Sequence, residues 1–313
     1  MKRAWLAWVE LWDRREPAYA LAIVRIGVAL ALLHDYLTVW RLDLIAPLWS
    51  TAPDGCATPS WGGWSVSWLG TGPDAAYTLW LAAVSAMIAV VTGTLTRVAC
   101  VVVVLISAQL AHLAPDADRG IDELLRVVLL VLALSRSHAV WSVDAWLLRK
   151  LGRPMATDIP AWPRYLLFAQ LIWVYFSGGH NKSGLEWSFS GGFTALANAL
   201  TDPHFARFDP GWVASVYPLT RVATALTMVF ELGAPLMLAF TYYAATRDRP
   251  GRIRRWCNRL RLRWIWIALG VSFHLGIAIT MRLGPFPWGM LALYPVLLFP
   301  DELTAVSGRW CAA

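Results

Sequence analysis

The sequence predicts an all-α integral membrane protein, a bundle of about eight transmembrane helices with both the N- and C-termini in the cytoplasm. Of its 313 residues, 58% are hydrophobic and only 15% are charged, whereas soluble domains carry nearer a quarter of charged residues. Its 20 Trp residues are also typical of a protein that meets the boundary between lipid and water. The third observation is a series of apolar segments, because a spanning helix needs roughly 20 apolar residues.

The first four apolar segments lie at about 17–40, 74–94, 97–115 and 122–140. Pro17 begins the first segment, since proline is tolerated in the first turn of a helix. The short turn "TGTLT" joins the second and third segments, and the fourth ends near Trp141. Residues 1–16 are charged and amphipathic, which predicts a cytoplasmic N-terminal segment rather than a cleavable signal peptide.

The last four apolar segments lie at about 163–182, 216–244, 264–283 and 286–300. Pro163 begins the first of these, and Pro235 is expected to kink the second. The eighth is short and contains two prolines, Pro287 and Pro295. The segments together predict a multi-pass membrane domain over residues 17–300, followed by a cytoplasmic tail over residues 301–313.

Loop charge predicts the orientation of this bundle. If the loops alternate between the two sides, starting inside, the inside loops are the basic ones, as the positive-inside rule requires. The inside loops then hold Lys2, Arg3, Arg14, Arg15, Arg97, Arg136, Arg149, Lys150, Arg153, Arg164, the eight Arg between positions 247 and 263, and Arg309. The outside loops clearly hold only Arg41, Arg119 and Arg207. Lys182 is then expected on the outer side of the inner (cytoplasmic) membrane.

Two long segments are predicted outside the membrane, residues 41–73 and 183–215. The first is rich in Pro, Gly and Trp, and the second contains "GGFTALANAL", which reads as a short amphipathic or re-entrant helix. Nothing repeats at a fixed period, so the sequence predicts neither a solenoid nor an inverted-repeat transporter. The Arg-rich run between positions 247 and 263 is expected to face anionic lipid, and a nucleic-acid partner is not expected.

Several classes of site find no support in the sequence. The four cysteines, Cys56, Cys100, Cys257 and Cys311, form no CxxC pair, and no His/Cys cluster has zinc spacing, so no metal site is expected. No nucleotide-binding glycine motif and no GxSxG hydrolase motif occurs. Polar residues inside the apolar segments therefore remain as the candidates, because each is costly in a bilayer.

Most of these polar residues are interpreted as structural. Arg25, Asp35, Arg126 and Glu231 are expected to pair across the bundle and to set helix register, since Arg makes a good anchor and a poor base. His180 and His274 are candidates for supporting polar groups in a site. A single His in an apolar helix is more often a satisfied structural group than a ligand.

Lys182 lies within the stretch "YFSGGHNKSGLEW", residues 175–187, and allows two interpretations. It could be a snorkelling lysine with its amine among the lipid headgroups. Alternatively, it could be a base or nucleophile, because a partly dry site favours the neutral amine. Gly178, Gly179 and Gly184 favour the second interpretation, because glycines allow a close backbone approach around the lysine.

Several segments, taken in order, resemble the membrane domain of vitamin K-dependent γ-glutamyl carboxylase and its bacterial relatives, the horizontally transferred transmembrane (HTTM) proteins. These segments are "VRIGVALALLHD", "GTLTRVAC", "VWSVDAWL", "VYFSGGHNKSGLEW", "FELGAPL" and "FHLGIAITMRLGPFPWGMLAL". The resemblance covers nearly the whole chain. Arg97, Trp141 and Asp144 belong to the matching turn and Trp-Ser-Val-Asp signature, and they are expected to be structural.

The resemblance implies a role for Lys182. In the carboxylase the lysine at this position deprotonates reduced vitamin K, and the products of the reaction with oxygen drive carboxylation of a Glu side chain. A quinone cofactor is therefore expected, with Lys182, Asp122, His180 and His274 in the catalytic group. The resemblance also implies that Tyr175, Phe176 and Trp187 contact the cofactor.

The chain departs from the carboxylase in two ways, and these leave two functions open. "RGIDE" stands where the carboxylase has a His that supports the Lys, so Asp122 is the nearest candidate here. The large lumenal domain that grips the protein substrate has no counterpart. The first hypothesis is a quinone-linked or carboxylase-like membrane enzyme with Lys182 as base. The alternative is a non-catalytic membrane partner in the maturation of a secreted peptide, as in the sporulation-delaying-protein system.

Overall fold

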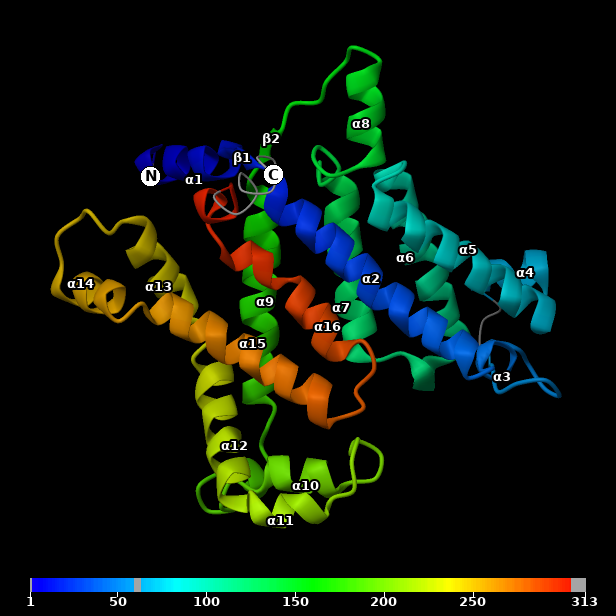
Figure 1. The fold of residues 1–313 in the computed structure, drawn as a ribbon. Helices are drawn as coiled ribbons and strands as arrows, with labels where there is room; N and C mark the ends of the chain where they lie inside the picture. Colours follow the sequence, from blue (N-terminus) through cyan, green and yellow to red (C-terminus); the bar gives the residue numbers. More distant parts are fainter. Residues whose placement is uncertain (1, 59–62, 305–313) are drawn as a thin grey trace. The chain divides into compact units, whose positions relative to one another are not determined.

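A computed structural model describes residues 2–58 and 63–304 (Figure 1). The chain divides into two compact units, each of which is described separately. Unit 1 runs up to Leu167 and resumes at Ala292, and unit 2 is Phe168–Leu291. The expectations for residues 59–62 of the first outer loop, and for Arg309 and Cys311, lie outside the described residues.

Unit 1 is mainly helical. Its helices are α1 (Lys2–Asp13), α2 (Tyr19–Arg41), α3 (Ile45–Trp49), α4 (Gly63–Leu69), α5 (Pro73–Thr92), α6 (Thr96–Leu113), η1 (Pro115–Ala117), α7 (Gly120–Leu134), α8 (Val143–Lys150), the first residues of α9 (Trp162–His180), and η3 (Tyr294–Leu297). Two three-residue strands, β1 (Arg15–Pro17) and β2 (Asp158–Pro160), pair antiparallel with Glu16 opposite Ile159. The sequence did not predict this pairing.

Helix α2 packs against α5, α7 and η3, and α6 packs against α5 and α7 (Figure 1). Leu21, Val28, Met87 and Leu125 are almost completely buried along these contacts. The outward faces are apolar as well, as Leu105, which is 53% exposed, illustrates. A helix that is apolar on all sides is buried or lies in a membrane, so these exposed faces fit a lipid environment.

The turn between α5 and α6 is held by two charged side chains. Arg25 is fully buried and donates to the carbonyl of Val90 at 2.6 Å, at the C-terminal end of α5, and to that of Trp141 at 2.6 Å. Asp144 accepts from the backbone N–H groups of Leu95 at 2.9 Å and Thr96 at 3.2 Å, where α6 begins. A cation at a helix C-terminus and an anion at an N-terminus both interact favourably with the helix dipole.

Gly93 allows the close packing at this turn. It has φ +72°, and a Cβ atom there would lie 2.7 Å from Arg25 Nη1. A side chain at this position would therefore meet both a backbone conformation that favours glycine and a buried guanidinium.

A buried ion pair joins the two ends of unit 1. Arg164, at the start of α9, donates to Glu16 through Nε at 2.6 Å and through Nη2 at 2.8 Å. Its Nη1 also donates to the carbonyl of Val296 at 3.1 Å. These bonds connect β1, α9 and η3, which are far apart in the sequence.

Unit 2 continues α9 to His180. It contains η2 (Leu185–Trp187), α10 (Ala195–Thr201), α11 (Gly211–Ser215), α12 (Tyr217–Leu232), α13 (Leu236–Ala245), α14 (Arg252–Arg259), α15 (Leu262–Thr280) and most of α16 (Phe286–Ala292). Helix α10 packs against α11 and α12, and α15 packs against α12, α13 and α14. The short helix predicted in "GGFTALANAL" is α10.

Helices α12 and α13 are bent relative to each other by 66°. The bend lies at Gly233–Pro235, which confirms the kink predicted at Pro235. It turns the sixth apolar segment into two shorter helices, and Glu231 lies in the last turn of α12.

Among the described residues, four helices are long and apolar enough to cross a membrane: α2, α5, α6 and α15. The bent pair of α12 and α13 makes a fifth if it counts as one span. Helix α7 is shorter than the predicted fourth segment, because it ends at Leu134 after 15 residues. There Ser135 Oγ donates to the carbonyl of Leu132 at 2.9 Å, and such local bonding by serine competes with helix continuation.

Replacing Asp144 should weaken the α5–α6 turn. Asp144→Ala removes the carboxylate that accepts from the first N–H groups of α6, and the loss of such a cap costs about 1 kcal/mol. Thermal unfolding of the detergent-solubilised protein should show a lower Tm for this variant. Asp54→Ala, which changes an exposed loop carboxylate, is the control. Equal Tm values for the two variants would contradict this account of the turn.

Candidate functional site

Lys182 lies two residues beyond the end of α9. The chain leaves the helix through backbone hydrogen bonds from Asn181 N to Ser177 O at 3.0 Å and from Lys182 N to Gly179 O at 3.3 Å. This tight exit turns the lysine side chain back along the end of the helix, where Nζ lies 3.5 Å from the Gly178 carbonyl. The amine therefore remains beside unit 2 rather than extending away from it.

Glu231, from the last turn of α12, is the partner of Lys182. The Nζ atom of Lys182 donates a short hydrogen bond to Glu231 Oε2. The carboxylate side chain is only 6% exposed and the lysine side chain 23%. Lys182 Nζ also lies over the ring of Trp187, 5.0 Å from its centroid, which is cation–π geometry. The pair thus combines a buried acid with an amine that solvent or a ligand can reach.

Gly179 permits this approach of α9 to α12. A Cβ atom at Gly179 would lie 2.9 Å from Glu231 Cβ and 3.1 Å from Leu232 N. At Gly178 the nearest atoms to a Cβ would be Glu231 Oε1 and Lys182 Nζ, both at an ordinary 3.9 Å. Of the glycines proposed to allow close approach, Gly179 is the one at which the α12 backbone is in direct contact.

His274 and Tyr175 form a second, fully buried polar pair in unit 2. The Tyr175 hydroxyl lies 2.6 Å from His274 Nε2. The Tyr175 ring meets Phe230 edge-on, with centroids 4.8 Å apart, and Trp266 with centroids 5.5 Å apart. Phe230 precedes Glu231, so adjacent positions of α12 contact the aromatic cluster and the Lys182 pair.

The remaining candidates on α9 do not converge on the amine. His180 is exposed, and its ring stacks on that of Phe176 with centroids 6.1 Å apart. Among the three residues expected to contact a cofactor, Tyr175 is buried in the aromatic cluster and Phe176 stacks on His180. Trp187 is the one that lies next to Lys182.

A cavity of about 470 Å³ opens in unit 2 between α10, α11, α12 and α15. Its walls are mainly apolar and include Phe230 and Phe273, which also contact the Tyr175–His274 pair. Neither Lys182 nor Glu231 lines it. The cavity is within the size range of small-molecule sites, and Phe230 and Phe273 belong both to its walls and to the aromatic cluster around Tyr175 and His274.

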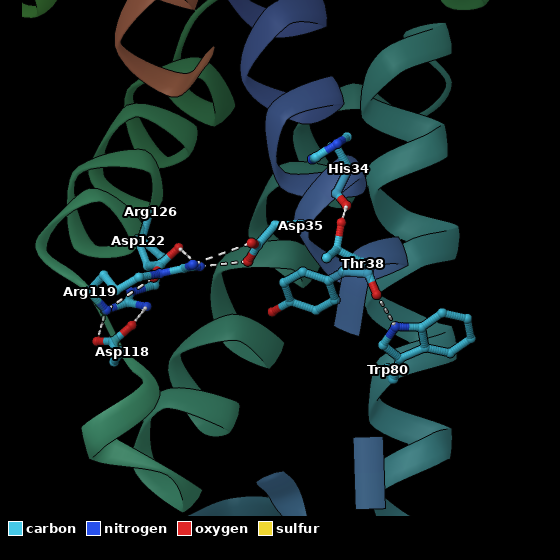
Figure 2. A network of polar contacts seen from close by, with 9 residues as sticks. His34, Asp35, Thr38, Trp80, Asp118, Arg119, Asp122 and Arg126 are labelled. Carbon is cyan, nitrogen blue, oxygen red and sulfur yellow. Dashed lines mark hydrogen bonds and ion pairs between the residues drawn. The ribbon is translucent and has the colours of Figure 1, made fainter. Parts of the chain in front are cut away.

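Unit 1 contains a separate polar cluster, shown in Figure 2, around a cavity of about 200 Å³. Arg119 precedes α7 and donates to Asp122 through Nε at 2.8 Å and to Asp35 of α2 through Nη2 at 2.6 Å. Arg126 of α7 makes a two-pronged contact with Asp118, at 2.8 and 2.6 Å. The carboxylates of Asp35, Asp118 and Asp122 are therefore each paired with one of two arginines.

The electrostatics of Arg119 follow from this cluster. Burial disfavours its charge, but hydrogen bonds to Asp122 and Asp35 outweigh burial and raise the pKa of its guanidinium. Because its pKa is higher in the folded than in the unfolded protein, the charge of Arg119 stabilises the fold fully below the unfolded-state pKa. This contribution is lost as the pH rises through the folded-state pKa. Because both pKa values lie far above neutrality, titration of Arg119 does not change the free energy of unfolding between about pH 5 and 9.

The structure places the predicted residues in both units. Lys182, His180 and His274 belong to unit 2, and Asp122 belongs to unit 1 with Arg119 as its partner. Support of Lys182 by Asp122 stays a prediction. Sequence reasoning missed Glu231 as the partner of Lys182, although Glu231 is the only acidic residue between Tyr217 and Ala245, which is the signal that could have found it.

Most of the charged residues expected to be structural contact backbone groups or other charges. Arg25 and Asp144 hold the α5–α6 turn, and Asp35 bonds to Arg119. Trp141 has φ +51° and packs on Tyr19 with ring centroids 5.4 Å apart. Arg97 is exposed. Over residues 2–58 and 63–304, no group of three or more His, Cys, Asp or Glu side chains could hold a metal ion.

The long apolar helices define a membrane protein. Residues 13–248 match the HTTM domain family, which is more than half of the chain, and the protein therefore belongs to the HTTM family. No curated protein and no solved structure matches the chain significantly.

Filling the space at Gly179 should disturb the site. Gly179→Ala brings a methyl group against the backbone of α12, and overpacking of this kind costs about 1–3 kcal/mol. Thermal unfolding of the solubilised protein should therefore show a lower Tm than wild type. Gly178→Ala is the matched control, because it meets only ordinary contacts and should change Tm much less. The account fails if Gly178→Ala is as destabilising as Gly179→Ala.

Proposed function

We propose that this HTTM protein carries out quinone-linked proton chemistry at the end of α9, with Lys182 as the base and Glu231 as its proton partner. The observation that supports it is the hydrogen bond between a partly exposed amine and a buried carboxylate. A lysine that served only to anchor the chain at the membrane surface would not need a buried acid. The ring of Trp187, which the Lys182 amine overlies, supplies a flat apolar surface against which the ring of a quinone packs.

The pair can supply a base without changing its net charge. While Lys182 is an ammonium ion it has no lone pair to accept a proton. Transfer of one proton from Lys182 Nζ to Glu231 Oε2 leaves a neutral amine beside a neutral acid, which removes the cost of holding two charges in a low-dielectric site. The amine of Lys182 then accepts a proton from a hydroxyl group of the bound substrate.

The residues present fit an apolar ring compound. The unit 2 cavity has the volume for an apolar ring or side chain, but Lys182 does not line it, so the reacting hydroxyl group would lie outside the cavity, beside Lys182 and Trp187. A reduced quinone such as reduced vitamin K would supply the acidic hydroxyl group and the reducing electrons. Tyr175 and His274 would then hold Phe230 in place through the aromatic cluster rather than contact the quinone.

The proposal also includes the number of membrane crossings and the orientation of the protein in the membrane. The bundle crosses the inner membrane about eight times, with both termini in the cytoplasm and Lys182 on the outer side. The loop charges support this orientation, since seven of the eight Arg between positions 247 and 263 lie directly before α15 and the eighth, Arg263, lies in its first turn. Helices α7 and α9, the bent α12–α13 pair and the short apolar helix Phe286–Leu297 would complete the eight crossings with the four long helices.

Removal of the base should abolish activity. Oxygen uptake by the purified protein with a reduced naphthoquinone should exceed the rate without enzyme, and Lys182→Ala should lower it by about 10²-fold or more, the usual contribution of a general base. Glu231→Gln keeps a hydrogen-bonding side chain but accepts no proton, so it should also lose activity. Lys150→Ala, which changes an exposed lysine of α8, should leave uptake unchanged.

Two results would contradict this proposal. Wild-type uptake no faster than the rate without enzyme would exclude this chemistry with that quinone. Uptake that persists in Lys182→Ala would exclude Lys182 as the base.

A second candidate function is a non-catalytic membrane partner for a secreted peptide. Exposed aromatic side chains in both long outer segments favour it, since Trp68 is 87% exposed and Phe189 is 89% exposed, and such residues are enriched at protein interfaces. A partner protein of this kind would tolerate Lys182→Ala and depend on residues 41–73 and 183–215.

A further inference from the structure

Helix α14 (Arg252–Arg259) carries two different exposed stripes. Ile253, Trp256 and Leu260 follow one another at helical spacing and are 67%, 58% and 43% exposed. Arg252, Arg255 and Arg259, also at helical spacing, are exposed on the adjoining side. An apolar stripe beside a cationic stripe is the pattern of a helix that lies in the plane of a membrane surface.

The opposite side of α14 is attached to unit 2. Cys257 is buried, and Asn258 donates to the Tyr243 carbonyl at 2.9 Å. The guanidinium of Arg254 lies 5.5 Å from the centre of the Tyr243 ring. These contacts orient the helix, so the two stripes face away from the protein.

The position of α14 in the chain places it at the end of a span. Only Leu260 and Arg261 separate it from α15, which is long and apolar enough to cross a membrane. Arg261 has φ +52°, which makes the chain turn sharply between the two helices. Because so short a connection cannot carry α14 far from the membrane, its exposed apolar stripe lies at the level of the headgroups.

Over residues 2–58 and 63–304, three arginines of α14 have no acidic partner. Between positions 247 and 263 the chain has eight Arg and one acidic residue, Asp248. Among the ion pairs of the described residues, none joins Arg252, Arg255 or Arg259 to a carboxylate. Phosphate groups of anionic lipid complement such a cluster, since arginine binds phosphate through a fork of donors.

We propose that α14 is an in-plane binding site for anionic phospholipid, in which Ile253, Trp256 and Leu260 insert among the acyl chains and Arg252, Arg255 and Arg259 bind the phosphates. A nucleic acid would satisfy the arginines but would leave the apolar stripe in water. The lipid surface satisfies both stripes at once. This site is independent of the role proposed for Lys182.

The test is lipid binding by the full chain, measured by native mass spectrometry with phosphatidylglycerol and with phosphatidylcholine of the same acyl chains. The wild type should bind phosphatidylglycerol at least about tenfold more tightly than phosphatidylcholine, because each basic residue adds to the attraction for an anionic headgroup. The triple variant Arg252→Gln, Arg255→Gln, Arg259→Gln should lose this preference. The matched control Arg149→Gln, Lys150→Gln, Arg153→Gln also removes three positive charges and should retain it.

A second variant keeps the test decisive if the Gln variant does not fold. Replacing the same three arginines by Lys keeps the charge, and this variant should still prefer phosphatidylglycerol, with a preference that falls as salt is raised. Equal wild-type affinity for the two lipids would overturn the proposal. So would an equal loss of the preference for phosphatidylglycerol in the α14 Gln variant and in the control. So would displacement of phosphatidylglycerol by a short DNA duplex that binds the wild type more tightly.

Discussion

Burying a charged side chain in an apolar bundle is costly unless hydrogen bonds or an opposite charge compensate for it, and this cost determines where the buried charged residues of this chain lie. Arg25 donates to the carbonyls at the end of α5, and Arg164 forms a two-pronged pair with Glu16. Lys182 bonds to Glu231. Each of these bonds joins segments that are distant in the sequence, so the pairing of buried charges also sets how the helices pack.

The Lys182–Glu231 pair differs from the others in its exposure. Arg164 and Glu16 are both almost completely buried, which suits a permanent structural contact. Lys182 keeps 23% of its side chain exposed while Glu231 is buried, so a ligand can reach the amine but not easily the acid. The exit of the chain from α9 and the bend at Gly233–Pro235 place both groups at helix ends.

Much of the fold could be predicted from the sequence, because hydropathy and proline positions are local signals. The predicted first segment, 17–40, corresponds to α2, and the bend at Pro235 was predicted correctly. The predicted fourth segment was too long, since apolar composition alone does not show that Ser135 ends α7. Glu231 was predicted to pair across the bundle, but its partner Lys182 was not identified, because spacing within one helix does not reveal which other helix it faces. The β1–β2 pairing was missed because three-residue strands leave no alternating pattern.

The coupling between Lys182 and Glu231 tests the central claim most directly. Tm and unfolding free energies would be measured for the wild type, Lys182→Ala, Glu231→Gln and the double variant in the same detergent. A hydrogen-bonded charge pair predicts that the two effects are not additive, with an interaction free energy of at least about 1 kcal/mol. Effects that add to within about 0.5 kcal/mol would show that the two side chains do not interact and would contradict the account of the site.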